Sequence, residues 1–370
     1  MGPTTTRHVA ELVAAAPLAL HAPPLRRTDC NSPVHVHGGR LFAFVSRHEP
    51  RGHAYRRVAP ARGGVGDDGL RALGAPVPVR IVDDPDPAVG KWIESTWRDA
   101  RGRLHGWYHA EEPAPAPARL FVPHIGALAS DDDGATWRCL GEALRAPAGL
   151  VDTGAANGFM AGGYGDFSVV ADREARFLYI HFSSYVADER AQGVAVARYP
   201  VAARDAPAGA VEIWRDGGWR PARGTLPTPL WPVARGWRHA DPDSFWGPAV
   251  HFNRDLGAHV MLLGHVAGPH PGFHAAGVAV SFNADLARPD GWSAPERIVE
   301  GGGWYPQVVG LGPDDGDTVA GAEARFLIGG LSAWHIRFRR ATGDADRPPP
   351  PRLDRAAMIE LARSLSPGGA

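Results

Sequence analysis

The sequence predicts an all-β protein, a five-bladed β-propeller with a short C-terminal helix. Three observations support this fold class. The 370 residues include 46 glycines and 35 prolines, which favours many short elements joined by turns over long helices. One hairpin pattern recurs five times along the chain. A helical periodicity is confined to the last residues of the chain.

Each hairpin consists of a polar or acidic lead-in, an apolar strand, a turn rich in Gly and Asp, and a second apolar strand. The five units lie at residues 29–47, 91–112, 165–185, 243–265 and 303–334, the last with a longer insertion. Their starts are separated by roughly 60 to 80 residues, which suits about four strands per unit in a radially repeated sheet. A β-sandwich with long insertions is the alternative interpretation.

The chain divides into three predicted parts. We expect residues 1–24 to form an N-terminal extension, residues 25–344 to form the propeller, and residues 345–370 to hold a proline linker and a helix. The linker, DRPPPPRL, has a stiff composition. After it, apolar residues recur at helical spacing, so that this helix should pack on the propeller or on a partner; they are Ala357, Met358, Leu361 and Leu365.

One turn motif is typical of propellers. The segment SDDDGATW, Ser130–Trp137, fits the Asp-box pattern, in which the aspartate and glycine shape a turn and the tryptophan anchors the hairpin. Such turns usually lie away from the functional site, so we do not interpret Asp131 to Asp133 as catalytic.

Composition excludes several classes of function. The 39 Lys and Arg residues balance 40 Asp and Glu residues, so nothing indicates a nucleic-acid partner. No apolar run reaches the roughly 18 residues of a membrane span. The apolar stretch near the start is interrupted by Glu11 and Pro17, so we expect a cytoplasmic protein rather than a secreted one. Cys30 and Cys139 allow one disulfide or two free thiols.

The hairpin lead-ins supply the candidate catalytic residues. Aligned on their turns, four units place these residues at one height: Asn31, Glu94, Asp166 and Trp246. Asp29 and Asp243 precede that height by two residues and therefore lie on the same strand face. Inner strands of a propeller start around one central funnel, so the acids should converge there. The alternative is that each acid caps a turn or pairs with a nearby arginine.

Converging carboxylates suit glycoside cleavage. One carboxyl must stay protonated to donate to the leaving oxygen, while another stays ionised as base or nucleophile. Proximity itself separates their pKa values, because like charges disfavour joint ionisation. Aromatic side chains in the lead-ins would stack on sugar faces. The predicted substrate-binding residues are Asn31, Trp92, Tyr164, Asp243, Trp246, Trp304, Tyr305 and Gln307.

Histidines do not indicate a metal site. His35 and His37 share one strand face, as metal ligands can, but no third ligand is near them in the sequence. We therefore predict no metal and no cofactor. His181 and His251 lie in predicted strands and would be satisfied polar groups near the funnel.

The lead-ins also carry a family resemblance. The chain resembles the five-bladed β-propeller glycoside hydrolases, which include the family 43 arabinanases and xylosidases and the family 32 fructosidases. The likeness covers roughly residues 25–340 and lies in DCNSPVHVHGGRLFAF, GDFSVVADREARFLYI and DSFWGPAVHFN. The chain looks more similar still to uncharacterised bacterial propeller proteins with WIES, GDFSV, SFWGP and WYPQV lead-ins.

The resemblance implies roles for three acids. In those families a first-blade acid is base or nucleophile, a second acid orients and tunes, and a glutamate donates the proton. Asp166 matches the third-blade aspartate. The first-blade position holds Asn31, with Asp29 two residues before it, and Trp246 stands where a Glu-Gly-Pro would supply the glutamate. Glu94 is the substitute donor on predicted geometry alone.

The sequence therefore predicts a glycoside hydrolase that acts on a carbohydrate, possibly a furanoside, with an undefined oligomeric state. Asp29 would be base or nucleophile, Glu94 the proton donor and Asp166 the tuning acid. The alternatives are a non-catalytic carbohydrate-binding propeller and an interaction scaffold whose C-terminal helix docks a partner. A sialidase would need an arginine cluster, and only Arg26 and Arg27 lie close to a lead-in.

Overall fold

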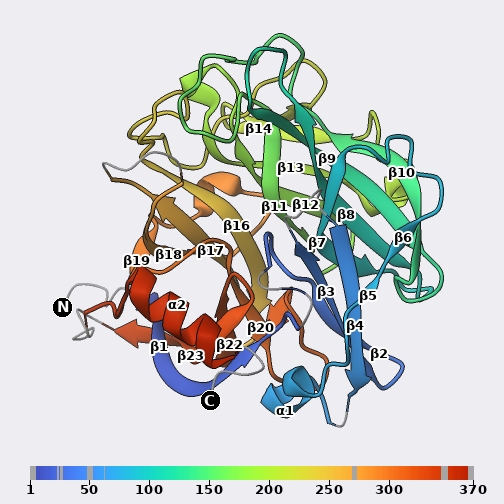
Figure 1. Ribbon diagram of the computed structural model, residues 1–370, viewed down its shortest axis with the longest axis vertical. Helices are drawn as coiled ribbons and strands as arrows, with labels where there is room; N and C mark the ends of the chain where they lie inside the picture. The colour runs from blue at the N-terminus through green and yellow to red at the C-terminus, as the bar shows by residue number, and fades with distance from the viewer. Residues whose placement is uncertain are drawn as a thin grey trace.

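The computed structural model describes residues 6–22, 25, 28–47, 53–61, 63–268, 273–342 and 349–365. Arg26 and Arg27, part of the proline linker and the last five residues lie outside this part of the chain. Within it the protein is built almost wholly of strands, arranged in five sheets (Figure 1).

The sheets follow the chain order of the predicted hairpins. The first contains β2 (Val34–His37), β3 (Arg40–Arg47), β4 (His53–Pro60) and β5 (Val77–Pro78). The second contains β7 (Gly90–Arg98), β8 (Leu104–Pro113), β9 (Phe121–Ser130), β10 (Thr136–Leu144) and the short β6 (Arg80–Ile81). The third contains β11 (Tyr164–Ala171), β12 (Phe177–Ser184), β13 (Gly193–Pro200), β14 (Glu212–Arg215) and β15 (Gly218–Pro221).

The last two sheets complete the set. The fourth contains β16 (Ser244–Asn253), β17 (Ala258–Val266), β18 (Ala275–Asn283) and β19 (Glu296–Gly301), with β21 (Val319–Ala320) and β24 (Arg352–Leu353) at its edges. The fifth contains β20 (Pro306–Gly310), β22 (Glu323–Ile328), β23 (Leu331–Thr342) and β1 (Thr6–Ala19). The α-helices are α1 (Gly66–Arg71) and α2 (Arg355–Ser364), and single 3-10 turns occur at Glu189–Ala191, Val201–Ala203 and Pro289–Gly291.

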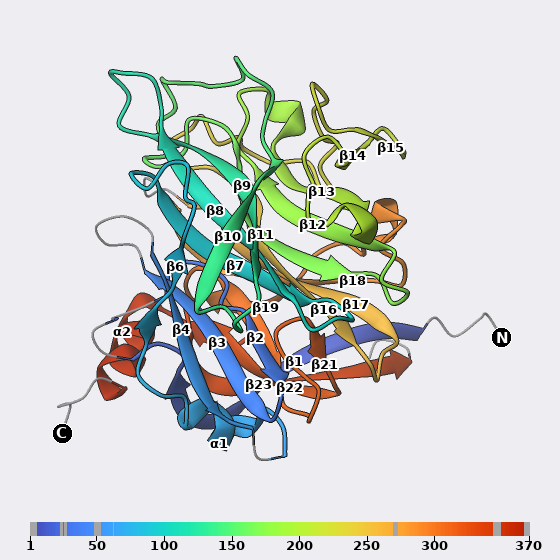
Figure 2. The same cartoon turned by 90° about the vertical axis from the view of Figure 1, so that its right-hand side faces the viewer.

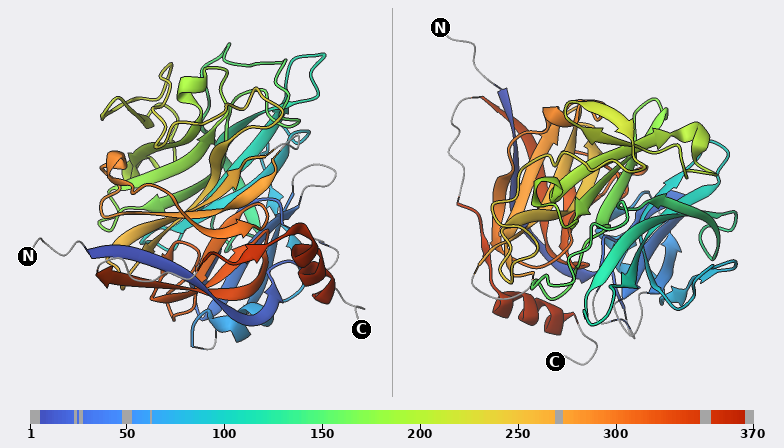
Figure 3. Two further views of the ribbon diagram at one scale, coloured as in Figure 1. Left: turned by 90° about the vertical axis from the view of Figure 1, so that its left-hand side faces the viewer. Right: turned by 90° about the horizontal axis from the view of Figure 1, so that it is seen from above.

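Five hydrophobic cores join the sheets into a closed ring. One core packs the first sheet on the second through Phe44 and Trp137, and others join the second to the third and the third to the fourth. A fourth core joins the fourth sheet to the fifth, and the last returns from the fifth sheet to the first through Val309 and Leu41. Each sheet therefore buries both faces against its neighbours, which is propeller packing. The view from above shows the sheets around a centre (Figure 3), and the predicted fold class is confirmed.

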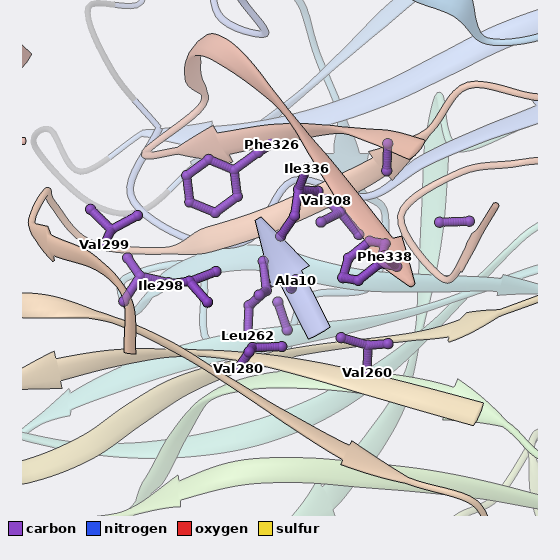
Figure 4. Close-up of a cluster of buried hydrophobic side chains, with 14 of the residues drawn as sticks. Ala10, Val260, Leu262, Val280, Ile298, Val299, Val308, Phe326, Ile336 and Phe338 are labelled. Carbon is purple, nitrogen blue, oxygen red and sulfur yellow. The ribbon is translucent and has the colours of Figure 1, made fainter. Parts of the chain in front are cut away.

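The two ends of the chain close the ring in one sheet. We expected residues 1–24 to be an extension, but Thr6–Ala19 forms β1, the outer strand of the fifth sheet, antiparallel to β23. Figures 2 and 3 show these two strands side by side. Ala10 of β1 lies among buried side chains of the fourth and fifth sheets, including Leu262 and Phe338 (Figure 4). Residues 6–19 therefore belong to the propeller, because their apolar face completes this core.

The turn between β9 and β10 is held by its own side chains. Ser130 Oγ donates to Asp132 Oδ1 at 2.8 Å, and the Thr136 backbone N–H donates to the same oxygen at 2.9 Å. Trp137 Nε1 donates to the Gly134 carbonyl at 3.1 Å, and its ring is fully buried. These contacts fix the hairpin on the outside of the second sheet.

Neither cysteine forms a disulfide: Cys30 is buried and Cys139 is half-buried. Within the described residues, neither helix has the length and apolar character needed to cross a membrane.

Candidate active site

Bulges mark the same height in three inner strands. The pairing register shifts between Ile93 and Ser95, between Gly165 and Phe167, and between Trp246 and Ala249. The extra residues are Glu94, Asp166 and the pair Gly247–Pro248. A bulge re-aims the side chain of its extra residue, and bulges are over-represented next to active sites. Glu94 and Asp166 therefore occupy equivalent positions in their units, as the alignment on the turns predicted. In the fourth unit Gly247 occupies this position rather than Trp246.

Two non-glycine residues at this height hold a left-handed backbone. The φ angle is 43° at Asp166 and 58° at Tyr305, which stands just before β20. Aspartate tolerates this region, whereas a bulky tyrosine enters it only when the surrounding structure imposes it. Such outliers gather at functional sites, so this height of the propeller is the place to look for chemistry.

The two acids at these bulges and the polar side chains around them form what we call the central cluster: Glu94, His109, Glu111, Asp166, Tyr185 and Tyr305. His109 Nδ1 lies 3.2 Å from Glu94 Oε1 and 4.0 Å from Asp166 Oδ1, and its Nε2 lies 3.5 Å from Glu111 Oε1. One imidazole therefore contacts three carboxyl groups.

Hydrogen bonds hold both acids of the cluster. Tyr305 donates its hydroxyl to Asp166 Oδ1 at 3.0 Å, and Tyr185 donates to Oδ2. The Phe167 backbone N–H donates to Glu94 Oε2 at 2.8 Å. Glu94 and Asp166 are each only 2% exposed.

Burial favours the protonated form of both acids in this cluster. Burial raises the pKa of Glu94 to about 7, against the lowering effect of His109. Burial also raises the pKa of Asp166, although His109 and the two tyrosines oppose the shift. Burial lowers the pKa of His109, but Glu111, Glu94 and Asp166 outweigh it and leave that pKa well raised.

Glu94 and His109 compete for one proton. The Asp166 backbone N–H donates to His109 Nδ1 at 3.0 Å, which requires the lone pair of that nitrogen. The contact between Nδ1 and Glu94 Oε1 requires a proton on one of the two partners. The pair therefore shares one proton, which lies on Glu94 when the imidazole accepts the Asp166 N–H and on His109 when the imidazole is charged.

A glycine makes room for His109. A Cβ atom on Gly165 would lie 2.5 Å from His109 Cε1, closer than any real Cβ contact. Gly163, with a φ of 88°, likewise places its backbone against Pro123, where a Cβ atom would lie 2.4 Å from the carbonyl oxygen. The glycines ahead of Asp166 therefore admit a histidine and a neighbouring strand.

Asn31 and Gln307 connect strands rather than facing an open funnel. Asn31 Nδ2 donates to the carbonyls of Phe167 and Pro248, both at 3.2 Å. Gln307 bonds Ser32 twice, accepting its N–H at 2.6 Å and donating to its carbonyl at 2.9 Å. Both side chains are buried. Here they fix the first sheet against the third, fourth and fifth.

Aromatic side chains close the central cluster from one side. We call Phe159, Trp237, Trp246, Phe273 and Trp304 the aromatic cover; they pack with Tyr185 and Tyr305 in one hydrophobic group. The Tyr185 ring contacts Trp237 at 5.0 Å between centroids, and Tyr305 contacts Trp246 at 5.3 Å. Because both tyrosines also bind Asp166, the cover lies directly over that acid. Trp246 is thus buried in the cover, with 2% of it exposed.

Two further predicted aromatic residues are buried at strand starts. Trp92 is buried in β7 and contacts the His109 ring edge-on at 5.7 Å. Tyr164 is buried at the start of β11 against Phe182, with 4.8 Å between ring centroids. Neither ring is open to a ligand in this conformation.

Asp29 lies apart from the other two predicted catalytic acids. It is half-buried and lines a cavity of about 900 Å³ together with Trp304, Phe273 and residues of α2. The charges of Asp166, Asp29 and Glu94 all help to raise the pKa of Tyr305, after its burial. Tyr305 therefore lies within electrostatic reach of both groups of acids. The structure brings Glu94 and Asp166 together and leaves Asp29 on the open side.

Asp243 is bound to a histidine beside this cavity. Its Oδ1 lies 2.9 Å from His265 Nε2, and His265 Nδ1 lies 2.8 Å from Arg297 Nη2. Arg297 also lines the cavity. Asp243 thus contributes to the rim through Arg297 rather than to the central cluster.

The central cluster is also the one group of metal-ligand type within the described chain. Ligand atoms of Glu94, His109 and Asp166 lie within 4.8 Å of one another. Each of the four carboxylate oxygens already has a protein partner at hydrogen-bonding distance. His35, considered above with His37, instead contacts Thr96 Oγ1 at 3.4 Å and Arg98 Nη2 at 3.3 Å.

His181 and His251 lie away from the cluster in the strands β12 and β16. Both are fully buried, and neither ring nitrogen of either residue has a hydrogen-bond partner within the described chain. Burial lowers the pKa of each to about 3. The prediction that they are satisfied polar groups near the funnel is therefore wrong, because each ring packs among apolar and aromatic neighbours such as Trp292 and Phe338.

Sequence reasoning predicted the C-terminal helix but missed His109 and Tyr185 and did not place α2 beside the site. His109 lies in the second strand of its hairpin and Tyr185 directly follows the second strand of its own, whereas the predicted site residues all come from lead-ins. A signal was present in "GWYHAEE", where His109 and Glu111 alternate onto one strand face. Nothing in the sequence indicated that α2 would border a cavity near Asp29.

Solved structures share this fold. No protein-family model matches the chain, and no curated protein matches it either. A protein assigned as an exo-β-1,3-galactanase from Bifidobacterium bifidum matches with a TM-score of 0.50 and 14% identity, over 90% of this chain and 94% of its own. An arabinanase from Bacillus subtilis matches with a TM-score of 0.45 and 11% identity, over 89% and 96% of the two chains.

A third match is the exo-β-1,3-galactanase from Phanerochaete chrysosporium, crystallised with β-1,3-galactotriose, with a TM-score of 0.47 and 10% identity. The match covers 90% of this chain but only 64% of that galactanase. The match to the Bifidobacterium bifidum protein, with its TM-score of 0.50, shows that this chain shares the fold of that protein.

Proposed function

We propose that the protein is a glycoside hydrolase that uses the acids at the centre of the propeller. The observation that carries this proposal is the burial of the Glu94 carboxyl 3.2 Å from His109, in a cluster that also holds Asp166. Burial raises the pKa of this carboxyl to about 7, so a protonated form is available near neutral pH to donate to a leaving oxygen. The fold shared with propeller glycosidases supports the same class of reaction.

The three acids take different roles because their environments differ. Glu94 is the proton donor. Asp29, which faces the cavity, is the base or nucleophile. Asp166, held by two tyrosine hydroxyls and next to His109, tunes the proton of Glu94 through that shared imidazole. Hydrolysis at Glu94 requires the aromatic cover to open, because this carboxyl is closed to solvent in the structure.

Single substitutions test the assignment. We would assay Asp29→Asn, Glu94→Gln and Asp166→Asn on a panel of aryl glycosides and on arabinan and galactan. Loss of a proton donor or a base costs typically 10²- to 10⁴-fold in rate. Asp131→Asn, in the exposed turn between β9 and β10, is the matched control and should leave the rate unchanged. Full activity in all three site variants would remove the assignment.

One observation favours a second function, a non-catalytic carbohydrate-binding propeller. The central acids are sealed, and Trp246 and Gly247 occupy the place where the glycosidase families carry a Glu-Gly pair. In that case glycan binding occurs without turnover and is unaffected by Glu94→Gln. Binding measured alongside the hydrolysis assay separates the two functions.

A further inference from the structure

The largest open feature near the proposed site is the cavity that Asp29 lines. We call it the α2 cleft. Its volume is about 900 Å³, in the range of small-molecule sites. It is bordered by the end of β19, the approach to β20 and helix α2, which lies beside the last sheet in Figure 1.

Helix α2 turns one face toward this cleft. The four helix residues that line it are spaced i, i+3, i+4 and i+7, which is one side of a helix: Arg355, Met358, Ile359 and Ala362. The helix is firmly placed. Asp354 caps it by accepting the Ala357 N–H at 2.9 Å, and β24 just before it pairs with β19. The wall is therefore a built part of the fold.

A second wall of the cleft is aromatic, and a glycine next to it lets the backbone before α2 approach closely. Trp304 and Phe273 line it, and Trp304 Nε1 donates to the Phe273 carbonyl at 2.7 Å, which fixes the indole. Gly301 has a φ of 73°, and a Cβ atom there would lie 2.5 Å from the Leu353 carbonyl oxygen. A tryptophan held in this way offers a flat apolar surface, as sugar faces require.

The charges around the cleft balance. Three carboxylates line it, Asp29, Glu300 and Asp354, against three guanidinium groups, Arg297, Arg352 and Arg355. A site for a phosphate or a uronate would show an excess of cationic groups. Equal numbers of acceptors and donors around an aromatic wall instead match the hydroxyl groups of an uncharged sugar, which both donate and accept.

We propose that a neutral oligosaccharide binds in the α2 cleft, between the helix face and Trp304, with one end at Asp29. This inference rests on the proposed function and adds to it the location and charge class of the ligand. The C-terminal helix thereby becomes part of the binding site instead of a surface for a partner protein.

The test blocks the cleft from the helix side. The probes are arabinotriose, β-1,3-galactotriose and cellotriose, with trigalacturonate as the charged comparison, measured by isothermal titration calorimetry on the full chain. Ala362→Trp fills the cleft, and we expect it to weaken binding of a neutral trisaccharide at least tenfold. Ala356→Trp, on the exposed face of the same helix, is the matched control and should change binding less than twofold.

A second variant protects the test against misfolding. Ile359 lines the cleft but is 41% exposed, so Ile359→Trp should fold and still obstruct the ligand. The proposal is overturned if both blocking variants bind as the wild type does, if trigalacturonate binds more tightly than each neutral sugar, or if no neutral trisaccharide binds.

Failure of this inference is separable from failure of the proposed function. One outcome contradicts the binding site in the cleft but supports the hydrolase: Glu94→Gln loses hydrolysis of aryl glycosides, while Ala362→Trp changes neither hydrolysis nor sugar binding. The opposite outcome contradicts the hydrolase but supports the binding site in the cleft: Ala362→Trp abolishes sugar binding, and the wild type hydrolyses no substrate.

Discussion

The central cluster and the α2 cleft hold acids from the same kind of lead-in but in opposite environments. Glu94 and Asp166 are bulge residues that point toward the propeller centre, beneath the aromatic cover. Asp29, two residues ahead of the corresponding position, lies on the wall of an open cavity. Asp29 thus lies in the segment before β2 and reaches an open cavity, whereas Glu94 and Asp166 are buried within β7 and β11.

This difference in burial suits the two regions to different chemical roles. Burial favours the protonated form of the acids in the cluster because it penalises their charged form. A half-buried acid beside a cavity can meet a ligand directly. If the two regions act together, Tyr305 is the residue that connects them, since its hydroxyl binds Asp166 and its pKa responds to the charges of both Asp166 and Asp29.

The largest expected effect is on stability and separates the two acids. Asp166→Ala leaves two buried tyrosine hydroxyls without an acceptor and places alanine at a φ of 43°. We expect it to lower the free energy of unfolding by roughly 3–5 kcal/mol. Asp29→Ala should lower it by about 1 kcal/mol or less, as is usual for a half-exposed position. Urea unfolding at pH 7 measures both.

Asp166→Asn is the conservative control for that pair. It keeps an acceptor for one tyrosine and a residue that tolerates the left-handed region, so its cost should be about half that of alanine. Equal losses for alanine at positions 29 and 166 would contradict the division into buried and open acids.

The next effect concerns pH. The pKa of Glu94 is raised from 4.5 to about 7, so the folded state binds a proton that the unfolded state has lost between these values. Stability contributed by this group is complete below pH 4.5 and falls as the pH rises to 7. Gln cannot ionise, so Glu94→Gln removes this pH-dependent loss of stability. Between pH 4.5 and 8 the free energy of unfolding of the variant should rise relative to that of the wild type by up to about 3 kcal/mol. Unfolding curves across this range measure the difference.

A difference that stays flat with pH would show that Glu94 ionises normally inside the cluster. That result would also remove the argument for Glu94 as proton donor. Asp166→Asn should show a slope of the same sign, because burial raises the pKa of Asp166 as well.

A smaller effect tests the connection between the two regions. Tyr305→Phe removes the hydroxyl that donates to Asp166 at 3.0 Å and leaves the ring in the aromatic cover. We expect a loss of about 1–2 kcal/mol and a further rise in the pKa of Asp166, because the charged form loses a donor. The pH titration of the Asp166 carboxyl by NMR measures the shift. A lowered pKa would contradict the hydrogen-bond assignment.

Much of the fold was predictable because it depends on local sequence patterns. Each hairpin shows alternating apolar residues and a turn, so the order of strands and the convergence of Glu94 and Asp166 followed from the repeats. Strand β1 was not predictable in this way. Its pairing with β23 joins residues more than 300 positions apart, and a non-local contact leaves no periodic signal in either segment alone.

The site was harder to predict than the fold. Alignment on the turns placed Trp246 at the height of the acids, since a bulge at Gly247 and Pro248 changes the register without changing the strand pattern. The solvent exposure of the lead-in side chains could not be predicted from the sequence either. Lead-in aromatic residues such as Trp246 and Tyr164 were expected to face a funnel, and only packing against residues from distant loops shows that they are buried.

The smallest expected effect is on the local stability of helix α2, which forms one wall of the α2 cleft, and it concerns the N-terminal cap of that helix. Asp354→Ala removes the acceptor for the Ala357 N–H, which costs about 1 kcal/mol of local helix stability. Because α2 packs on the outside of the ring, global unfolding should change by less than about 0.5 kcal/mol while amides of α2 exchange faster with solvent. Hydrogen exchange compares α2 with β11, which carries Asp166 and should keep its protection. Faster exchange in both would mean that the cleft wall and the central cluster open as one unit, and the two regions would then no longer be independent.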